Sequence, residues 1–95
     1  MTRSTDKDQI MRDVAAILES RLGLLSAADL ERDTRFFADL GLASIDAVVL
    51  GEAVQEHYQR PLPFNLLMAD IGARADRDLA IGELVDFIEH HLNTL

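Results

Sequence analysis

The sequence contains no cysteine, so it can form neither a disulfide framework nor a zinc site built on thiolates. It has one lysine, and its other basic residues are arginines that form no cluster. Because binding to phosphate backbones requires several basic contacts on one face, we expect neither nucleic acid nor an anionic membrane as a partner. No apolar run approaches the roughly 18–20 residues of a membrane span. The polar N-terminus shows no targeting segment, and we therefore expect a cytoplasmic protein.

The residues that are present describe a small folded domain. The chain has 95 residues, of which 48% are hydrophobic, and a formal net charge of −8. This length suits one domain, and this hydrophobic fraction is too high for a disordered acidic tail. We expect a single monomeric domain over residues 1–95, with an ordered core over about 5–92. The negative charge keeps the protein in solution and steers it towards basic surfaces of partners.

Apolar residues at helical spacing predict helices and no β-strand. The first helix begins with a capping box at Thr5–Asp8 and ends near Gly23. Its apolar stripe comprises Ile10, Met11, Val14, Ile17, Leu18 and Leu22. Residues 24–43 form a long connection in which Ser26–Asp29 is predicted to cap a single turn. This connection is too apolar for a purely solvated loop, because it contains Phe36, Phe37, Leu40 and Leu42. We therefore expect it to cross the protein and plug one end of a helical bundle.

Three further helices complete the prediction. The second runs from Ser44 to about Tyr58 and is ended by two prolines, which cannot continue the helical hydrogen bonds. A short third helix covers Asn65–Ile71 with Asn65 as its N-cap, and the last covers about 79–92 with Asp78 as its N-cap. The predicted fold is all-α, a small four-helix bundle with three long helices, one short third helix and a long first loop.

The helix predicted over residues 44–58 has two faces. One has the spacing of a core stripe and comprises Ala47, Leu50, Gly51, Val54 and Tyr58. The opposite face is apolar and then acidic, and comprises Ile45, Val48, Val49, Glu52 and Glu56. Because one apolar stripe suffices to hold a helix, the second indicates a docking surface for a partner with a basic rim. The alternative is that a neighbouring loop, with Phe36 or Phe37, covers it.

Ser44 stands at the start of this helix, and two interpretations are open. In the first, its side chain is an ordinary N-cap. In the second, Ser44 is a covalent attachment point, because a helix N-terminus offers unpaired N–H groups and a partial positive charge that stabilise a phosphodiester.

Residues 39–48, Asp-Leu-Gly-Leu-Ala-Ser-Ile-Asp-Ala-Val, resemble the attachment motif of acyl carrier proteins and the related peptidyl carrier proteins. The family pattern is Asp-Leu-Gly, an apolar residue, usually Asp, then Ser, then Leu or Ile. The motif residues before the serine are Asp39, Leu40, Gly41 and Leu42. The resemblance covers nearly the whole chain, because the helix order, the loop with Phe36 and the closing amphipathic helix also match.

The resemblance implies a non-catalytic carrier domain with the four-helix fold. Ser44 would accept 4′-phosphopantetheine from coenzyme A through a phosphopantetheinyl transferase, and the thiol of this arm would hold an acyl or aminoacyl group as a thioester. Loading enzymes and downstream condensing, tailoring or transferring enzymes would be the other partners. The family uses its second helix for recognition. The implied partner-binding residues are Ile45, Asp46, Val48, Val49, Glu52 and Glu56, with Asp46 beside the arm.

Two positions depart from the family pattern. Ala43 replaces the usual aspartate before the serine, and Val49 stands where fatty-acid carriers usually have a glutamate. The first change favours a broad-specificity transferase. Together they favour specialised partners in a polyketide, non-ribosomal peptide or hybrid pathway of natural-product biosynthesis. Because no flanking domain is visible, we expect a freestanding carrier, with a domain excised from a larger protein as the alternative.

Other functions find less support in the sequence. Glu83, Asp86 and His90 share a polar face at a spacing that metal ligands can use, but no second set of ligands accompanies them, so we expect no metal site. No Gly-x-Ser-x-Gly turn surrounds Ser44, which argues against a hydrolase. An unmodified helical interaction module, which would use the face of Ile45, Val48 and Val49 with Ser44 only as a cap, stays open as the alternative.

Overall fold

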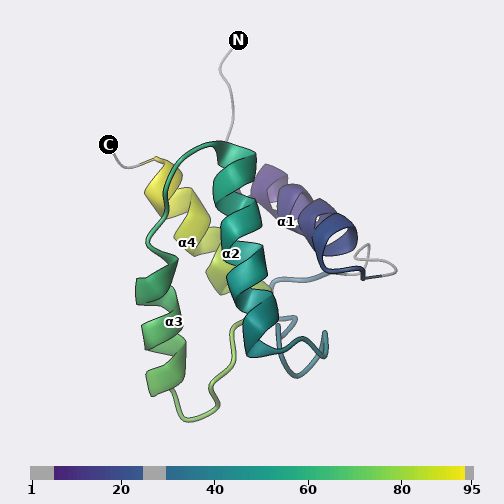
Figure 1. Cartoon of the computed structure of the whole chain (residues 1–95), viewed down its shortest axis with the longest axis vertical. Helices are drawn as coiled ribbons and strands as arrows, with labels where there is room; N and C mark the ends of the chain where they lie inside the picture. The colour runs from purple at the N-terminus through teal and green to yellow at the C-terminus, as the bar shows by residue number, and fades with distance from the viewer. Residues whose placement is uncertain (1–5, 25–29, 94–95) are drawn as a thin grey trace.

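Four helices make up most of the described residues, 6–24 and 30–93, of the computed structural model (Figure 1). They are α1 (Lys7–Arg21), α2 (Ser44–Tyr58), α3 (Phe64–Ala73) and α4 (Ile81–Leu92). No strand occurs in these two ranges, where an isolated bridge pairs Arg35 with Ala80. The predicted all-α fold is therefore confirmed, and α3 is the shortest helix, with 10 residues. None of the helices described is long and apolar enough to cross a membrane.

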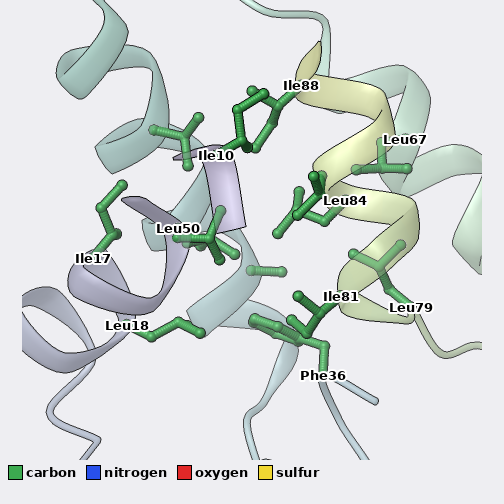
Figure 2. Packing of buried hydrophobic residues seen from close by; sticks show 14 of the residues in the cluster. Ile10, Ile17, Leu18, Phe36, Leu50, Leu67, Leu79, Ile81, Leu84 and Ile88 are labelled. Carbon is green, nitrogen blue, oxygen red and sulfur yellow. The ribbon is translucent and has the colours of Figure 1, made fainter. Parts of the chain in front are cut away.

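The core lies where α1 packs against both α2 and α4. Figure 2 shows Ile10 of α1, Leu50 of α2 and Leu84 of α4 gathered around a common centre. Full burial of such a side chain contributes about 1.5–3 kcal/mol, so this cluster is what holds the three helices together. The largest side chains that are less than 2% exposed are Phe36, Ile10, Leu18, Ile81, Leu84, Ile88, Val14, Val54 and Val85.

The ends of α1 follow from local chemistry. The Asp6 carboxylate accepts a hydrogen bond of 2.8 Å from the amide of Gln9, which makes Asp6 the N-cap. Thr5, where the capping box was predicted to begin, and the turn predicted at Ser26–Asp29 lie outside the described residues. Gly23 ends the helix as predicted, because its φ of 73° is in the left-handed region that glycine adopts without a steric penalty.

The starts predicted for α3 and α4 are wrong. Pro63, not Asn65, is the N-cap of α3, and the helix continues past Ile71 to Ala73. The N-cap of α4 is Ala80, not Asp78. The amide of Ala80 donates to the Glu83 carboxylate at 3.0 Å. The acid that stabilises this helix start is therefore a residue of the first turn and not the residue before the helix.

Asp78 instead fixes the long loop before α2. Its buried carboxylate accepts hydrogen bonds from the amides of Phe37 (3.0 Å), Ala38 (3.1 Å) and Leu79 (2.8 Å). Burial by itself raises the pKa of Asp78, but the three N–H donors, together with the charge of Arg35, outweigh it and hold this pKa below its usual value. The loop is thereby tied to the chain that leads into α4.

The same loop also supplies acceptors to the first turn of α4. The amide of Ile81 donates to the Thr34 carbonyl and that of Gly82 to the Arg32 carbonyl, each at 2.8 Å. The loop passes so close that a Cβ on Gly82 would lie 3.0 Å from Arg32 atoms. Phe36 is fully buried beneath these contacts, which confirms that it plugs the bundle (Figure 2).

Candidate functional site

The motif residues before Ser44 shape the turn that leads into α2. The Asp39 carboxylate accepts a hydrogen bond of 2.8 Å from the amide of Arg35 and so closes the loop on itself. Gly41 has a φ of 69°, a conformation that side chains other than glycine adopt only with strain. Leu40 and Leu42 are half-buried against the core cluster. The turn is therefore fixed by a carboxylate, a glycine and two apolar anchors.

Ser44 is the first residue of α2, and it is exposed. The N-cap is Ala43, whose amide donates to the Asp46 carboxylate at 2.8 Å. The interpretation of Ser44 as an N-cap is therefore wrong, because Ser44 lies inside the helix and no side chain at the N-cap position accepts a capping hydrogen bond. Among the described residues, no hydrogen bond engages the Ser44 hydroxyl.

The backbone around this serine is suited to an anionic group. The amides of Asp46 and Ala47 donate to the Ala43 carbonyl, at 2.9 and 3.3 Å. Within the described part of the chain, the amides of Ser44 and Ile45 make no hydrogen bond. They are free donors at the positive end of the helix, where a phosphate ester on the serine oxygen would be stabilised.

The second face of α2 is open to solvent, as the docking interpretation requires. Ile45 is 66% exposed and Val48 49%, whereas Val49 is half-buried. Glu52 and Glu56 are exposed further along the helix. The alternative, in which Phe36 or Phe37 covers this face, is wrong, because Phe36 lies in the core and Phe37 is packed against it.

A groove of about 390 Å³ lies beside this face, between α2 and α3. Its lining is Ala47, Val48, Gly51, Glu52, Gln55, Phe64, Asn65 and Met68. The groove is narrow at Gly51, where a Cβ would lie only 3.2 Å from the Phe64 ring, so glycine permits the close approach expected there. The groove begins one helical turn after Ser44 and faces solvent.

Two features of this surface were not predicted. Arg21, at the end of α1, forms an ion pair with Glu56 across the junction of α1 and α2. Leu66 of α3 is 62% exposed. The pair joins positions 35 residues apart in sequence, so only the packing angle of the two helices determines it. Leu66 lies in a run of apolar residues, so the sequence does not show which of them is exposed.

The acids of α4 are engaged with basic side chains. Glu83 binds Arg74 at 2.8 Å, and this bond is the main reason that its pKa lies below its usual value. Asp86 binds Arg32 at 2.8 Å and Lys7 at 3.2 Å. Among the described residues, no group of three histidine or acidic side chains is arranged to hold a metal ion.

Comparison with known proteins identifies the family to which this chain belongs. The family model described as "Phosphopantetheine attachment site" matches residues 12–73. The chain belongs to this carrier family. It is 32% identical over 87 residues to an acyl carrier protein of Cyanidium caldarium, covering 92% of this chain and 91% of the relative. No solved structure matches the carrier significantly.

A second relative is the mitochondrial acyl carrier protein of Saccharomyces cerevisiae. It is 31% identical over 85 residues, and the match covers 86% of the carrier and 62% of the yeast protein. The carrier is therefore a non-catalytic protein with a covalently attached 4′-phosphopantetheine arm. It acts with a phosphopantetheinyl transferase and with partner enzymes.

Proposed function

We propose that the 4′-phosphopantetheine arm is attached to Ser44, and that the carrier presents acyl or aminoacyl intermediates from there. The observation that carries this proposal is the exposed Ser44 hydroxyl, unpaired within the described structure, at the first residue of α2. The free amides of Ser44 and Ile45 supply two donors for the phosphodiester. Asp46 holds the helix start through Ala43 and so positions the serine.

The attachment reaction needs only a nucleophilic oxygen from the carrier. Ser44 Oγ forms a bond to the phosphorus next to the pantetheine of coenzyme A, the phosphoanhydride bond breaks, and the nucleotide part leaves. The transferase supplies the base that takes the hydroxyl proton. Once attached, the arm supplies the thiol that holds the cargo, and this chain has no cysteine that would compete for it.

The recognition surface in this proposal is the exposed face of α2. Ile45 and Val48 are its apolar centre, next to Ser44, while Glu52 and Glu56 are its acidic extension. Val49 is half-buried and contributes its outer edge. A small apolar patch can anchor a partner while the acids steer its basic groups into place.

We also propose that the partners belong to a polyketide, non-ribosomal peptide or hybrid biosynthetic pathway. The support is the chemistry of the positions around the serine. Ala43, exposed at the N-cap, removes a charge next to the attachment point, and Val49 removes another from the recognition face. The surface is consequently more apolar than that of a carrier with acids at both positions. It suits partners that bind through shape complementarity more than through charge.

Intact-mass measurement tests the attachment site. After incubation with coenzyme A and a broad-specificity transferase, the protein should gain one phosphopantetheine, and Ser44→Ala should gain none. Ser20→Ala is the matched control, because Ser20 is also an exposed helical serine and should leave the reaction unchanged. Modification of Ser44→Ala, or no modification of the wild type by several active transferases, would contradict the proposal and favour the unmodified interaction module.

A further inference from the structure

The two acids on the recognition face of α2 differ in their surroundings. Glu52 makes no ion pair or hydrogen bond with any described residue. Glu56, one helical turn further on, forms an ion pair with the guanidinium of Arg21. The two carboxylates are therefore unequal acceptors for a partner's basic side chain, although both are exposed.

The position of Arg21 at the end of α1 has an ordinary explanation, because a cation there interacts favourably with the negative end of the helix. That explanation does not require contact with another helix. The side chain nevertheless crosses to α2 and borders a hollow of about 290 Å³ between the two helices. The hollow is lined by Ile17, Ser20, Arg21, Ala53, Glu56 and His57.

We infer that Arg21 is a specificity-determining residue that withholds Glu56 from the basic side chains of partner enzymes. This inference rests on the proposed function, in which partners dock on the exposed face of α2. A partner that needs a cation on Glu56 must first displace the guanidinium, and it binds more weakly as a result. In this inference the transferase is such a partner, because it reaches Ser44 across this face and places a basic side chain on Glu56 when Glu56 is free.

The exposure of this ion pair makes such competition feasible. The two side chains are 48% and 70% exposed, so the pair is weak and a partner can open it. An exposed pair of this kind corresponds to about a two- to fivefold change in a binding constant. Arg21 therefore biases the choice between partners without blocking the face.

A double-mutant cycle tests the inference. The apparent KM and kcat for modification of Ser44 by a broad-specificity transferase are measured at low salt on the wild type, Arg21→Gln, Glu56→Gln and the double variant. Arg21→Gln should lower KM about two- to fivefold with kcat unchanged, because Glu56 is released. Glu56→Gln should cancel the gain made by Arg21→Gln, because the gain depends on the Glu56 carboxylate.

Arg12→Gln is the matched control, because it removes the same charge from the same helix. Arg12 bonds to Gln9 within α1 and makes no contact of this kind with α2 in the described structure. Equal effects of Arg12→Gln and Arg21→Gln would mean that only net charge matters, and would overturn the inference. A gain that persists in the double variant, or an unchanged KM in Arg21→Gln, would overturn it as well.

The outcomes separate this inference from the proposed attachment site. If no protein of the cycle is modified, and the intact mass of Ser44→Ala and of the wild type is equally unchanged, the attachment proposal fails. The inference about Arg21 then fails as well, because it rests on that proposal. If Ser44 is modified at the same KM in all four proteins of the cycle, the attachment site stands and only the role of Arg21 is refuted. Melting curves of the four proteins show whether any loss comes from unfolding.

Discussion

The two ends of α2 are held in different ways. At the C-terminal end, the Tyr58 hydroxyl donates to the Asp13 carboxylate of α1 at 2.6 Å. The Gln55 side chain accepts a hydrogen bond of 2.8 Å from the amide of Leu62 in the turn that follows. At the N-terminal end, Ser44 and Ile45 are exposed, and the bond that fixes the helix start, from Ala43 to Asp46, is local.

This difference shows how a short helix can be fixed to the core at one end and open to binding partners at the other. Burial and the hydrogen bond to Asp13 raise the pKa of Tyr58, so its hydroxyl stays protonated and keeps donating to α1. The N-terminal end is placed indirectly, through the loop that Asp78 pins beneath it. The backbone is thereby fixed at both ends, while the side chains at one end stay free for other molecules.

The largest effect should come from removing the anchor of the loop. Asp78→Ala leaves the amides of Phe37, Ala38 and Leu79 without their acceptor and should lower the free energy of unfolding by about 3 kcal/mol. Asp76→Ala is the control, because Asp76 is an exposed acid in the same connection, and its loss should cost less than about 1 kcal/mol. Urea unfolding measures both values.

The stability difference between the wild type and Asp78→Ala should also depend on pH. Because the pKa of Asp78 is lowered in the folded state, the stability that it contributes is complete above the usual carboxyl pKa and is lost as the pH falls below about 4. The difference between the wild type and Asp78→Ala should therefore shrink between pH 5 and pH 3. A constant difference over that range would contradict the role assigned to the carboxylate.

A smaller effect is expected at the anchored end of α2. Tyr58→Phe removes the hydroxyl that bonds to Asp13 and should cost about 1–2 kcal/mol in thermal or urea unfolding. Modification of Ser44 should proceed at an unchanged rate, since the change lies at the far end of the helix. A large loss of modification in a fully folded Tyr58→Phe protein would show that the two ends are coupled.

The smallest effect is expected at the open end. Ala43→Asp places a good capping residue at the N-cap and should stabilise the protein by about 0.5–1 kcal/mol, reduced by repulsion from Asp46. Ser44→Ala is the matched control one residue along and should change stability by less than about 0.5 kcal/mol, because Ser44 caps nothing. A loss of 1 kcal/mol or more in Ser44→Ala would restore the capping role that the structure denies.

Much of the fold could be predicted because helical periodicity is a local signal. The start of α2 at Ser44 was predicted, its end was placed near Tyr58, and Gly23 was recognised as the stop signal of α1. The starts of α3 and α4 were not, because Asp78 and Asn65 have the side chains of good caps. A sequence pattern cannot show that such a side chain already binds an amide elsewhere, as Asp78 does.

In the candidate site, too, local features could be predicted and features that depend on tertiary contacts could not. The motif from Asp39 to Ser44 could be recognised without coordinates by its resemblance to the carrier-family pattern, and its residues form local contacts in the structure. The exposure of Ile45 and Val48 was a choice between two interpretations until the position of the loop was known. The ion pair of Arg21 with Glu56 was not predicted at all, since it depends on the packing of two helices.

The sequence by itself determined the helices, the turn at Gly41 and the serine that follows it, because these depend on backbone preferences and on contacts within a few residues. Only the tertiary structure decided that Asp78 anchors the loop and does not cap α4, and that one face of α2 stays open. The physical reason is that a carboxylate or an apolar stripe bonds or packs with whatever the fold brings near it, and that neighbour is set by the packing of α1, α2 and α4.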